Sequence, residues 1–386
     1  MPNKKRTIFT KILIWRYKYI SERQFILVLS VLVGFLAGLG TVLLKYLTLF
    51  IQSVLEGGFI RNYYYSLYFI FPIVGVWLVY LIKKNFLKKE IGHGISTTLY
   101  AISKRSGIIE RYKMFASLMV APITVGFGGS VGLQGPAVST GAAIGSNVAS
   151  MFHMNAKTRM LLIGCATAGA MSSMFKAPVA AIVFAVEIFS LDLVFTSLVP
   201  LLLASVAAVI TSYFFRGTDV LFSFELLDAW RVKDIIFYVF LGVATGIASV
   251  YFSKMYFLIT RFFAWFSNAY VKIGIAALAI GLMLYLFPPL YGEGYGLINN
   301  LLNGETEAAL NGIQYQIDFN NVWIVIAILL IIAVFKAIAM TTTFAAGGVG
   351  GIFIPTLFMG SALGNSVAKV INQFGFEVSE SNFTLI

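Results

Sequence analysis

The sequence predicts an all-α, polytopic membrane protein, and three observations support that fold class. The 386-residue chain is 59% hydrophobic and 11% charged, with a mean hydropathy of +0.88. An ordinary soluble domain is only about 45–50% apolar. Several apolar segments are long enough to cross a bilayer as helices, and a glycine-rich motif ending in proline occurs once in each half of the chain.

The long apolar segments are the candidate membrane helices. A spanning helix needs about 20 apolar residues, because each residue rises by ~1.5 Å. The candidate segments are residues 25–50, 66–82, 194–214, 235–262, 273–287 and 322–340. Shorter glycine-rich stretches follow between residues 112 and 189. Lipid cannot satisfy backbone polar groups, so irregular backbone there must be buried in protein or line a cavity.

The net charge of +12 predicts membrane topology rather than nucleic-acid binding. Basic residues gather before the first apolar segment and directly after the second, and two crossings return the chain to the side it left. Both clusters then obey the positive-inside rule if residues 1–24 are cytoplasmic. We expect a cell-membrane protein with a basic N-terminus at 1–24 and membrane repeats at 25–214 and 230–386. The clusters comprise Lys4, Lys5, Arg6, Lys11, Arg16, Lys18, Arg23, Lys83, Lys84, Lys88 and Lys89.

The two glycine-rich breaks at residues 128–136 and 347–355 are related to each other. Counted from each terminal proline, glycine recurs eight, seven and four residues before it and five and nine residues after it. Interrupted hydrophobic segments in corresponding halves indicate broken helices whose ends meet at a substrate site near the midplane. The matching glycines are Gly128, Gly129, Gly132, Gly141 and Gly145 in one half and Gly347, Gly348, Gly351, Gly360 and Gly364 in the other.

These breaks suit the binding of an anion. A helix N-terminus carries about half a positive charge and unpaired N–H groups, and Pro136 and Pro355 each fit the first turn of a helix. A third start is expected at residues 92–96. Glycines also serve close helix packing, but packing alone does not require the duplicated pattern. A cation site would need carbonyl rings or acidic side chains. Among the acids only Glu187 lies deep within an apolar segment, so the sequence favours an anion.

The three motifs resemble those of the CLC family of chloride channels and proton-coupled chloride exchangers. Residues 92–95 resemble the family's GSGIP element, 132–136 its G-[KR]-E-G-P element and 351–355 its GxFxP element, in the family's order. The resemblance implies an inverted repeat of tilted helices. It also implies a homodimer in a lipid membrane, with one anion pore in each subunit. It implies no enzymatic reaction, no cofactor and no metal.

By the same resemblance, backbone amides would bind the anion. The outer site would use the amides around the first and second breaks, and the central site would use those of Ile352 and Phe353 together with residue 93. The candidate anion-binding residues are Gly92, His93, Gly94, Leu133, Gln134, Gly135, Ile352, Phe353 and Ile354.

Three positions depart from the family pattern. Gln134 stands where the family has its gating glutamate, and an amide cannot carry a proton or compete as a carboxylate. Ile188 stands at the inner proton-transfer glutamate, although a register shift of one would give that role to Glu187. His93 replaces a serine; its imidazole could donate to the anion and make binding pH-dependent, or could point away while the backbone binds.

The second half is also shorter than the first. A partner for the helix expected at Pro178 would begin beyond Ile386, so we expect the family's final helices, and the tyrosine they carry, to be absent. Before the second break, Lys336 and residues 341–343 are expected to cap or pair with backbone there.

The sequence therefore predicts passive conduction of chloride or another small anion, with proton coupling lost at Gln134 and Ile188. Two alternatives stay open. One is a coupled chloride/proton exchanger in which His93, water or another acid carries the proton. The other is a non-transporting membrane fragment.

Overall fold

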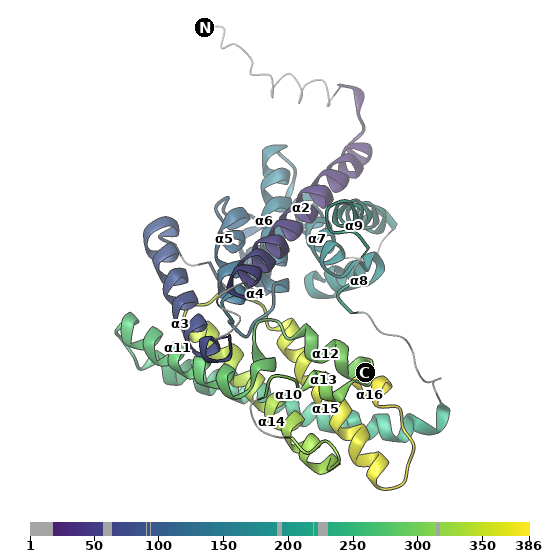
Figure 1. Cartoon of the computed structure of the whole chain (residues 1–386). Helices are drawn as coiled ribbons and strands as arrows, with labels where there is room; N and C mark the ends of the chain where they lie inside the picture. Colours follow the sequence, from purple (N-terminus) through teal and green to yellow (C-terminus); the bar gives the residue numbers. More distant parts are fainter. Residues whose placement is uncertain are drawn as a thin grey trace. The chain divides into compact units, whose positions relative to one another are not determined.

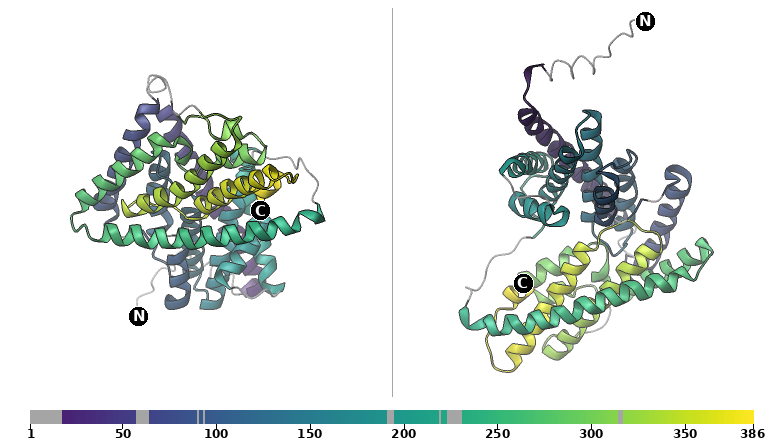
Figure 2. Two further views of the ribbon diagram at one scale, coloured as in Figure 1. Left: turned by 90° about the horizontal axis from the view of Figure 1, so that it is seen from below. Right: turned by 180° about the vertical axis from the view of Figure 1, so that it is seen from behind.

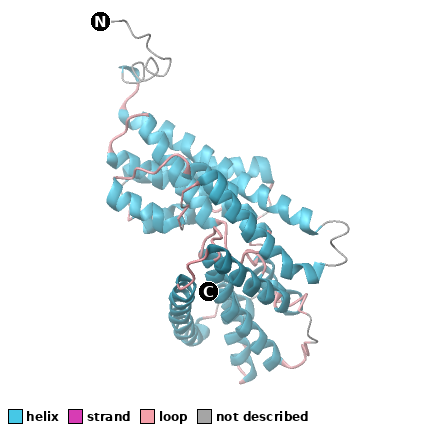
Figure 3. Cartoon of the chain, turned by 90° about the vertical axis from the view of Figure 1, so that its left-hand side faces the viewer, coloured by secondary structure: helices cyan, strands magenta, loops and turns pink. Residues whose placement is uncertain are grey.

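The computed structural model describes residues 18–56, 64–89, 91–92, 94–190, 195–218, 220–222, 231–313 and 317–386. These residues form helices and loops (Figure 3). Within those ranges the only β-type pairing is a single bridge between Gly132 and Gly351, so the all-α prediction is confirmed. His93 and the basic residues before position 18 lie outside the described residues.

The six predicted membrane segments correspond to long apolar helices. Within the described ranges, six helices are long and apolar enough to cross a membrane. Each overlaps one segment expected from the sequence. They are α2 (Glu22–Glu56), α3 (Tyr64–Ile82), α9 (Phe195–Arg216), α10 (Ile235–Ala264), α11 (Ala269–Leu286) and α14 (Val322–Ala345) (Figure 1).

The other elements connect these spans, and three of them begin at the predicted helix starts. Helix α4 starts at Gly94, α6 at Gln134 and α15 at Phe353, so Pro136 and Pro355 stand in first turns as expected. The other elements are η2 (Lys83–Leu87), α4 (Gly94–Arg105), α5 (Lys113–Gly126), α6 (Gln134–Met151), α7 (Ala156–Phe175), α8 (Pro178–Phe189), η3 (Val232–Asp234), η4 (Pro288–Leu290), α12 (Tyr295–Leu302), α13 (Thr306–Ala309), α15 (Phe353–Gln373) and α16 (Glu380–Leu385).

The chain divides into two compact units that interleave along the sequence. Unit 1 comprises Met1–Leu44, Gly94–Leu118 and Pro136–Asp219. Unit 2 comprises Lys45–His93, Met119–Gly135 and Val220–Ile386. The division into repeats at 25–214 and 230–386 stays a prediction.

Small residues allow the helices of unit 1 to pack closely. Helix α7 packs against α8 and α9. A Cβ atom on Gly141 would stand 2.7 Å from the carbonyl oxygen of Ala166, and one on Gly169 would stand 3.1 Å from Cα of Gly34. Such contacts hold membrane helices together because lipid tails supply no hydrophobic force between them. The expected packing role of glycine is therefore real at these positions.

Unit 2 is built around α14 and α15. These two helices pack against each other, and α14 also contacts α11. The long helix α10 runs alongside both (Figure 2). Helix α3 packs on α11, while α12 and α16 pack on α15. Unit 2 also contains residues 128–135 of the first break and the whole second break, so it positions the candidate site.

Candidate functional site

The two breaks pair with each other inside unit 2. The Gly132 N–H donates to the Gly351 carbonyl at 3.0 Å, and the Gly351 N–H donates to the Gly132 carbonyl at 2.7 Å. The backbones are too close for side chains, because a Cβ on Gly351 would stand 2.6 Å from the Gly135 nitrogen. The meeting of the two ends, expected from the repeat alone, is thus observed.

Two threonines extend this pairing with a reciprocal exchange. The Ser130 N–H in the first break donates to Oγ1 of Thr343 at 3.3 Å. The Val349 N–H in the second break donates to Oγ1 of Thr124 at 3.1 Å. Each threonine stands twelve residues before the proline of its own break. The repeat in sequence is therefore a two-fold repeat of hydrogen bonds, and Thr343 pairs with backbone as expected, but with that of the opposite break.

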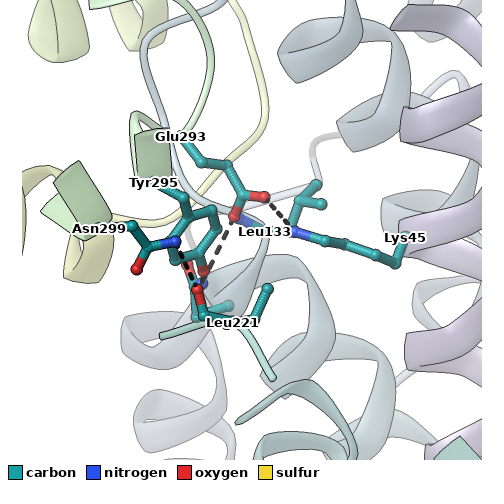
Figure 4. A network of polar contacts seen from close by, with 7 residues as sticks. Lys45, Leu133, Leu221, Glu293, Tyr295 and Asn299 are labelled. Carbon is teal, nitrogen blue, oxygen red and sulfur yellow. Dashed lines mark hydrogen bonds and ion pairs between the residues drawn. The ribbon is translucent and has the colours of Figure 1, made fainter. Parts of the chain in front are cut away.

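A carboxylate lies at the start of α6. Oε1 of Glu293 accepts the Leu133 N–H at 3.0 Å, and Nε2 of Gln134 donates to the same oxygen at 3.4 Å. Nε2 of Gln134 also donates to the Tyr295 hydroxyl at 2.6 Å. The Leu133 amide, a candidate anion-binding group, therefore donates to the carboxylate of Glu293 (Figure 4).

Lys45 completes the coordination of this carboxylate. Nζ of Lys45 donates to Oε2 of Glu293 at 2.8 Å, and the two side chains are only 8% and 7% exposed. The ammonium also lies 4.7 Å from the ring centroid of Tyr295. Removing one partner from a buried pair leaves an uncompensated charge. The pair and the helix terminus therefore stabilise each other.

Lys336 anchors the loop that carries Glu293. Its fully buried ammonium donates to the carbonyls of Gly292, at 3.0 Å, and Leu290, at 3.3 Å. The sequence had placed its partners at the second break, and that prediction was wrong: the partners lie between η4 and α12. Glu293 also lines a cavity of about 500 Å³, together with Lys45 and Tyr295.

The second break has a different environment. Nζ of Lys83 donates to the Gly347 carbonyl at 2.5 Å, which places a cation near the C-terminus of α14. Ile352 is 47% exposed and Ile354 fully buried. Phe353, the first residue of α15, is half-buried. Unit 2 thus brings together the six candidate residues of the two breaks, namely Leu133, Gln134, Gly135, Ile352, Phe353 and Ile354.

The other candidate residues are divided between the units. Gly92 belongs to unit 2, while Gly94 begins α4 in unit 1. Glu187 and Ile188 both lie on α8 in unit 1, where Ile188 packs against a hydrophobic cluster and Glu187 is exposed. The roles assigned to these positions stay predictions.

Sequence reasoning missed Glu293 and Lys45. It took Glu187 as the only deep acid, but Glu187 is exposed and Glu293 is buried. Lys45 did carry a signal, since an ionisable residue inside a membrane segment marks a functional position by default. Glu293, between two glycines and after two prolines, has the local sequence of a surface turn.

Sequence comparison places the chain among known membrane transport proteins. A family model described as "Voltage gated chloride channel" matches residues 74–386. The chain is 26% identical over 304 residues to the "Putative chloride channel protein ClcB-like" of Ralstonia nicotianae, covering 76% of this chain and 65% of that protein. It is 26% identical over 370 residues to the H(+)/Cl(-) exchange transporter ClcA of Vibrio cholerae, covering 89% of this chain and 73% of that protein. The chain thus spans slightly less than two thirds of the Ralstonia protein.

Solved structures agree with the fold. The structure of a slow cyanobacterial Cl-/H+ antiporter matches with a TM-score of 0.75 at 18% identity, over 95% of this chain and 84% of that one. That of a CLC-type fluoride/proton antiporter matches with a TM-score of 0.71 at 22% identity, over 93% and 83%. These likenesses confirm a polytopic CLC-type helical fold. The family match, with the paired breaks, identifies this chain as a member of the CLC family, a family of channels and transporters rather than enzymes.

Proposed function

We propose that this protein moves a small anion, chloride in the first instance, across a membrane by passive conduction past the paired breaks. The observation that carries the proposal is the anion held at the start of α6. The Leu133 N–H and Lys45 Nζ bind the Glu293 carboxylate at 3.0 and 2.8 Å. Donors that hold a carboxylate also suit chloride, because both anions accept N–H hydrogen bonds.

Weak, shared binding suits conduction. An ion must bind well enough to enter and weakly enough to leave, and helix termini supply partial rather than full charges. The residues around Leu133 and those around Ile352 would form the outer site, and Ile352 and Phe353 with residue 93 the central one. The paired backbone at Gly132 and Gly351 supports this assignment because it fixes both helix starts together.

Loss of proton coupling is the second part of the proposal. Gln134 is fully buried at the helix start and its amide cannot titrate. Ile188, at the position of the inner acid, is apolar. Neither side chain can bind and release a proton, so anion movement would not be coupled to proton movement.

A coupled chloride/proton exchanger is the second candidate. It is favoured by the exchange activity named for the Vibrio relative and by a buried acid, Glu293, in contact with Gln134. In that case a carboxylate absent from the usual position would be supplied from the loop before α12.

Reconstitution into vesicles tests both candidates. Chloride-loaded vesicles with a potassium ionophore should release chloride rapidly when they contain the protein, with empty vesicles as the control. A pH-sensitive dye in the same vesicles should report no uphill proton movement driven by a chloride gradient. Protein-dependent proton pumping would support the exchanger, and no chloride release would contradict both.

Assembly and topology complete the proposal. We infer a cytoplasmic N-terminus, because the basic residues around Arg23 and Lys83 flank two successive spans. From the family resemblance we also infer a homodimer in the cell membrane. Labelling of single introduced cysteines from each side of the membrane tests the orientation. Crosslinking in the membrane tests the dimer.

A further inference from the structure

Glu293 is held by three different kinds of N–H donor. These are the backbone amide of Leu133, the side-chain amide of Gln134 at 3.4 Å, and the ammonium of Lys45. None of the three is specific for a carboxylate; each would equally bind a small spherical anion. The side chain of Glu293 therefore occupies the position that a free anion would take at the start of α6.

Hydrogen bonds fix the orientation of the Gln134 side chain. Its Nε2 donates to both Glu293 and Tyr295, while its Oε1 is buried and has no hydrogen-bond partner among the described residues. The amide is therefore oriented as a donor toward the carboxylate. A second carboxylate at position 134 would face Glu293 as a like charge, which disfavours ionisation of both. The amide at 134 and the acid at 293 are complementary.

The loop around Glu293 is built to hold the side chain at a fixed point while leaving it space. Gly292 and Gly294 have φ of +57° and +86°, in the left-handed region that glycine tolerates best. Lys336 fixes the carbonyls on the N-terminal side of the turn. The cavity of about 500 Å³ beside Glu293 is lined by Lys45, so a displaced carboxylate could remain close to its cation.

We propose that Glu293 is a tethered competing anion. Its carboxylate occupies the amide site at the start of α6 when no ion is bound, and a free monovalent anion displaces it into the adjacent cavity beside Lys45. This inference rests on the proposed function, since it assigns the occupant of the same site. It places the competing carboxylate on the loop before α12, outside both glycine-rich breaks.

Chloride binding to the purified protein tests the proposal without requiring transport. Isothermal titration with chloride in detergent, at one fixed pH, compares the unaltered protein with Glu293→Gln. Removing the competitor should tighten chloride binding by about tenfold, because the three donors become available. Glu293→Asp, whose side chain is one methylene shorter and cannot span Lys45 and Leu133 as well, should tighten it by a smaller factor. Unchanged or weaker chloride binding in both folded variants would overturn the proposal.

A matched control is available elsewhere in unit 2. Glu380 forms an ion pair with Lys369 at 2.5 Å, so Glu380→Gln also leaves a lysine without its carboxylate but does so away from the breaks. Its chloride affinity should equal that of the unaltered protein, and an equal tightening in this control would contradict a site-specific competitor. Should Glu293→Gln fail to fold, Glu293→Asp against the same control decides the question.

The two proposals fail separately. Tighter chloride binding in Glu293→Gln together with no chloride release from vesicles would refute conduction and support the tethered anion. Rapid release with equal chloride affinities would refute the tethered anion and support conduction.

Discussion

The two glycine-rich breaks have the same backbone and different chemistry. Their glycines pair through Gly132 and Gly351, and their threonines exchange hydrogen bonds in matching positions. Two residues before each proline, however, the first break has Gln134 and the second has Phe353. The difference teaches that the repeat determines the paired backbone of the two breaks, which is their frame, whereas Glu293 and Lys45 from outside the repeat determine what the start of α6 binds.

The frame is most sensitive at its glycines. Gly351→Ala would place a methyl group 2.6 Å from the Gly135 nitrogen, where backbone rather than a flexible side chain must move. We expect the melting temperature to fall by about 5 °C or more and chloride release to fall at least about tenfold. Thermal melting and vesicle flux measure the two effects.

Gly360→Ala in the same helix is the matched control. A Cβ there would meet nothing within 4 Å, so its flux should equal that of the unaltered protein and its melting temperature should be equal or slightly higher, because alanine favours a helix interior over glycine. Equal behaviour of the two variants would contradict the close pairing of the breaks.

The second test concerns the chemistry of the first break. Gln134→Glu should lower stability by about 1–3 kcal/mol, because it adds a carboxylate beside that of Glu293 in a buried site. Adding Glu293→Gln in the same chain should restore most of the lost stability, because one acid and one amide are then present again. Thermal melting of the two single variants and the double variant measures this coupling. Stability losses that simply add in the double variant would contradict the contact between residues 134 and 293.

The two-fold exchange between the breaks predicts equal effects at two distant positions. Thr124→Val and Thr343→Val each remove one acceptor for a backbone N–H of the opposite break, at about 1 kcal/mol each. The two melting temperatures should fall by the same amount. A large fall in the melting temperature of only one variant would show that the two threonine hydrogen bonds are not equivalent.

The smallest effect is expected at Lys83. Its contact with the Gly347 carbonyl supports the end of α14, so Lys83→Met should cost less than about 1 kcal/mol. Chloride affinity should stay unchanged, since Lys83 contacts the Gly347 carbonyl and none of the amides assigned to the anion. A chloride affinity that falls with this variant would contradict the separation of the Lys83 contact from the anion site.

The sequence was sufficient to predict the helices and the two breaks, but not the side chains that contact Gln134. Hydropathy predicted α2, α3, α9, α10, α11 and α14, because length and apolar composition determine membrane helices. The duplicated glycines and prolines predicted where α6 and α15 begin. The partner of Gln134 could not be predicted in the same way. Glu293 is 159 residues away along the chain, and only folding brings it to the helix start.

Local sequence also misled at single residues. Glu187 stands in an apolar run, yet it lies on an exposed side of α8, because hydropathy does not reveal which face of a helix is covered. Lys336 was expected near the second break but binds the carbonyls of Leu290 and Gly292. A long side chain can bind backbone that is distant in sequence, and the sequence pattern does not predict which way the side chain points.

The central claim is uncoupled anion conduction, and the reversal potential across a planar bilayer tests it most directly. With the protein in the bilayer, a tenfold chloride gradient should produce a potential of about 59 mV. A pH gradient added at constant chloride should leave that potential unchanged. A potential that moves with the pH gradient would contradict the account and show that protons travel with the anion.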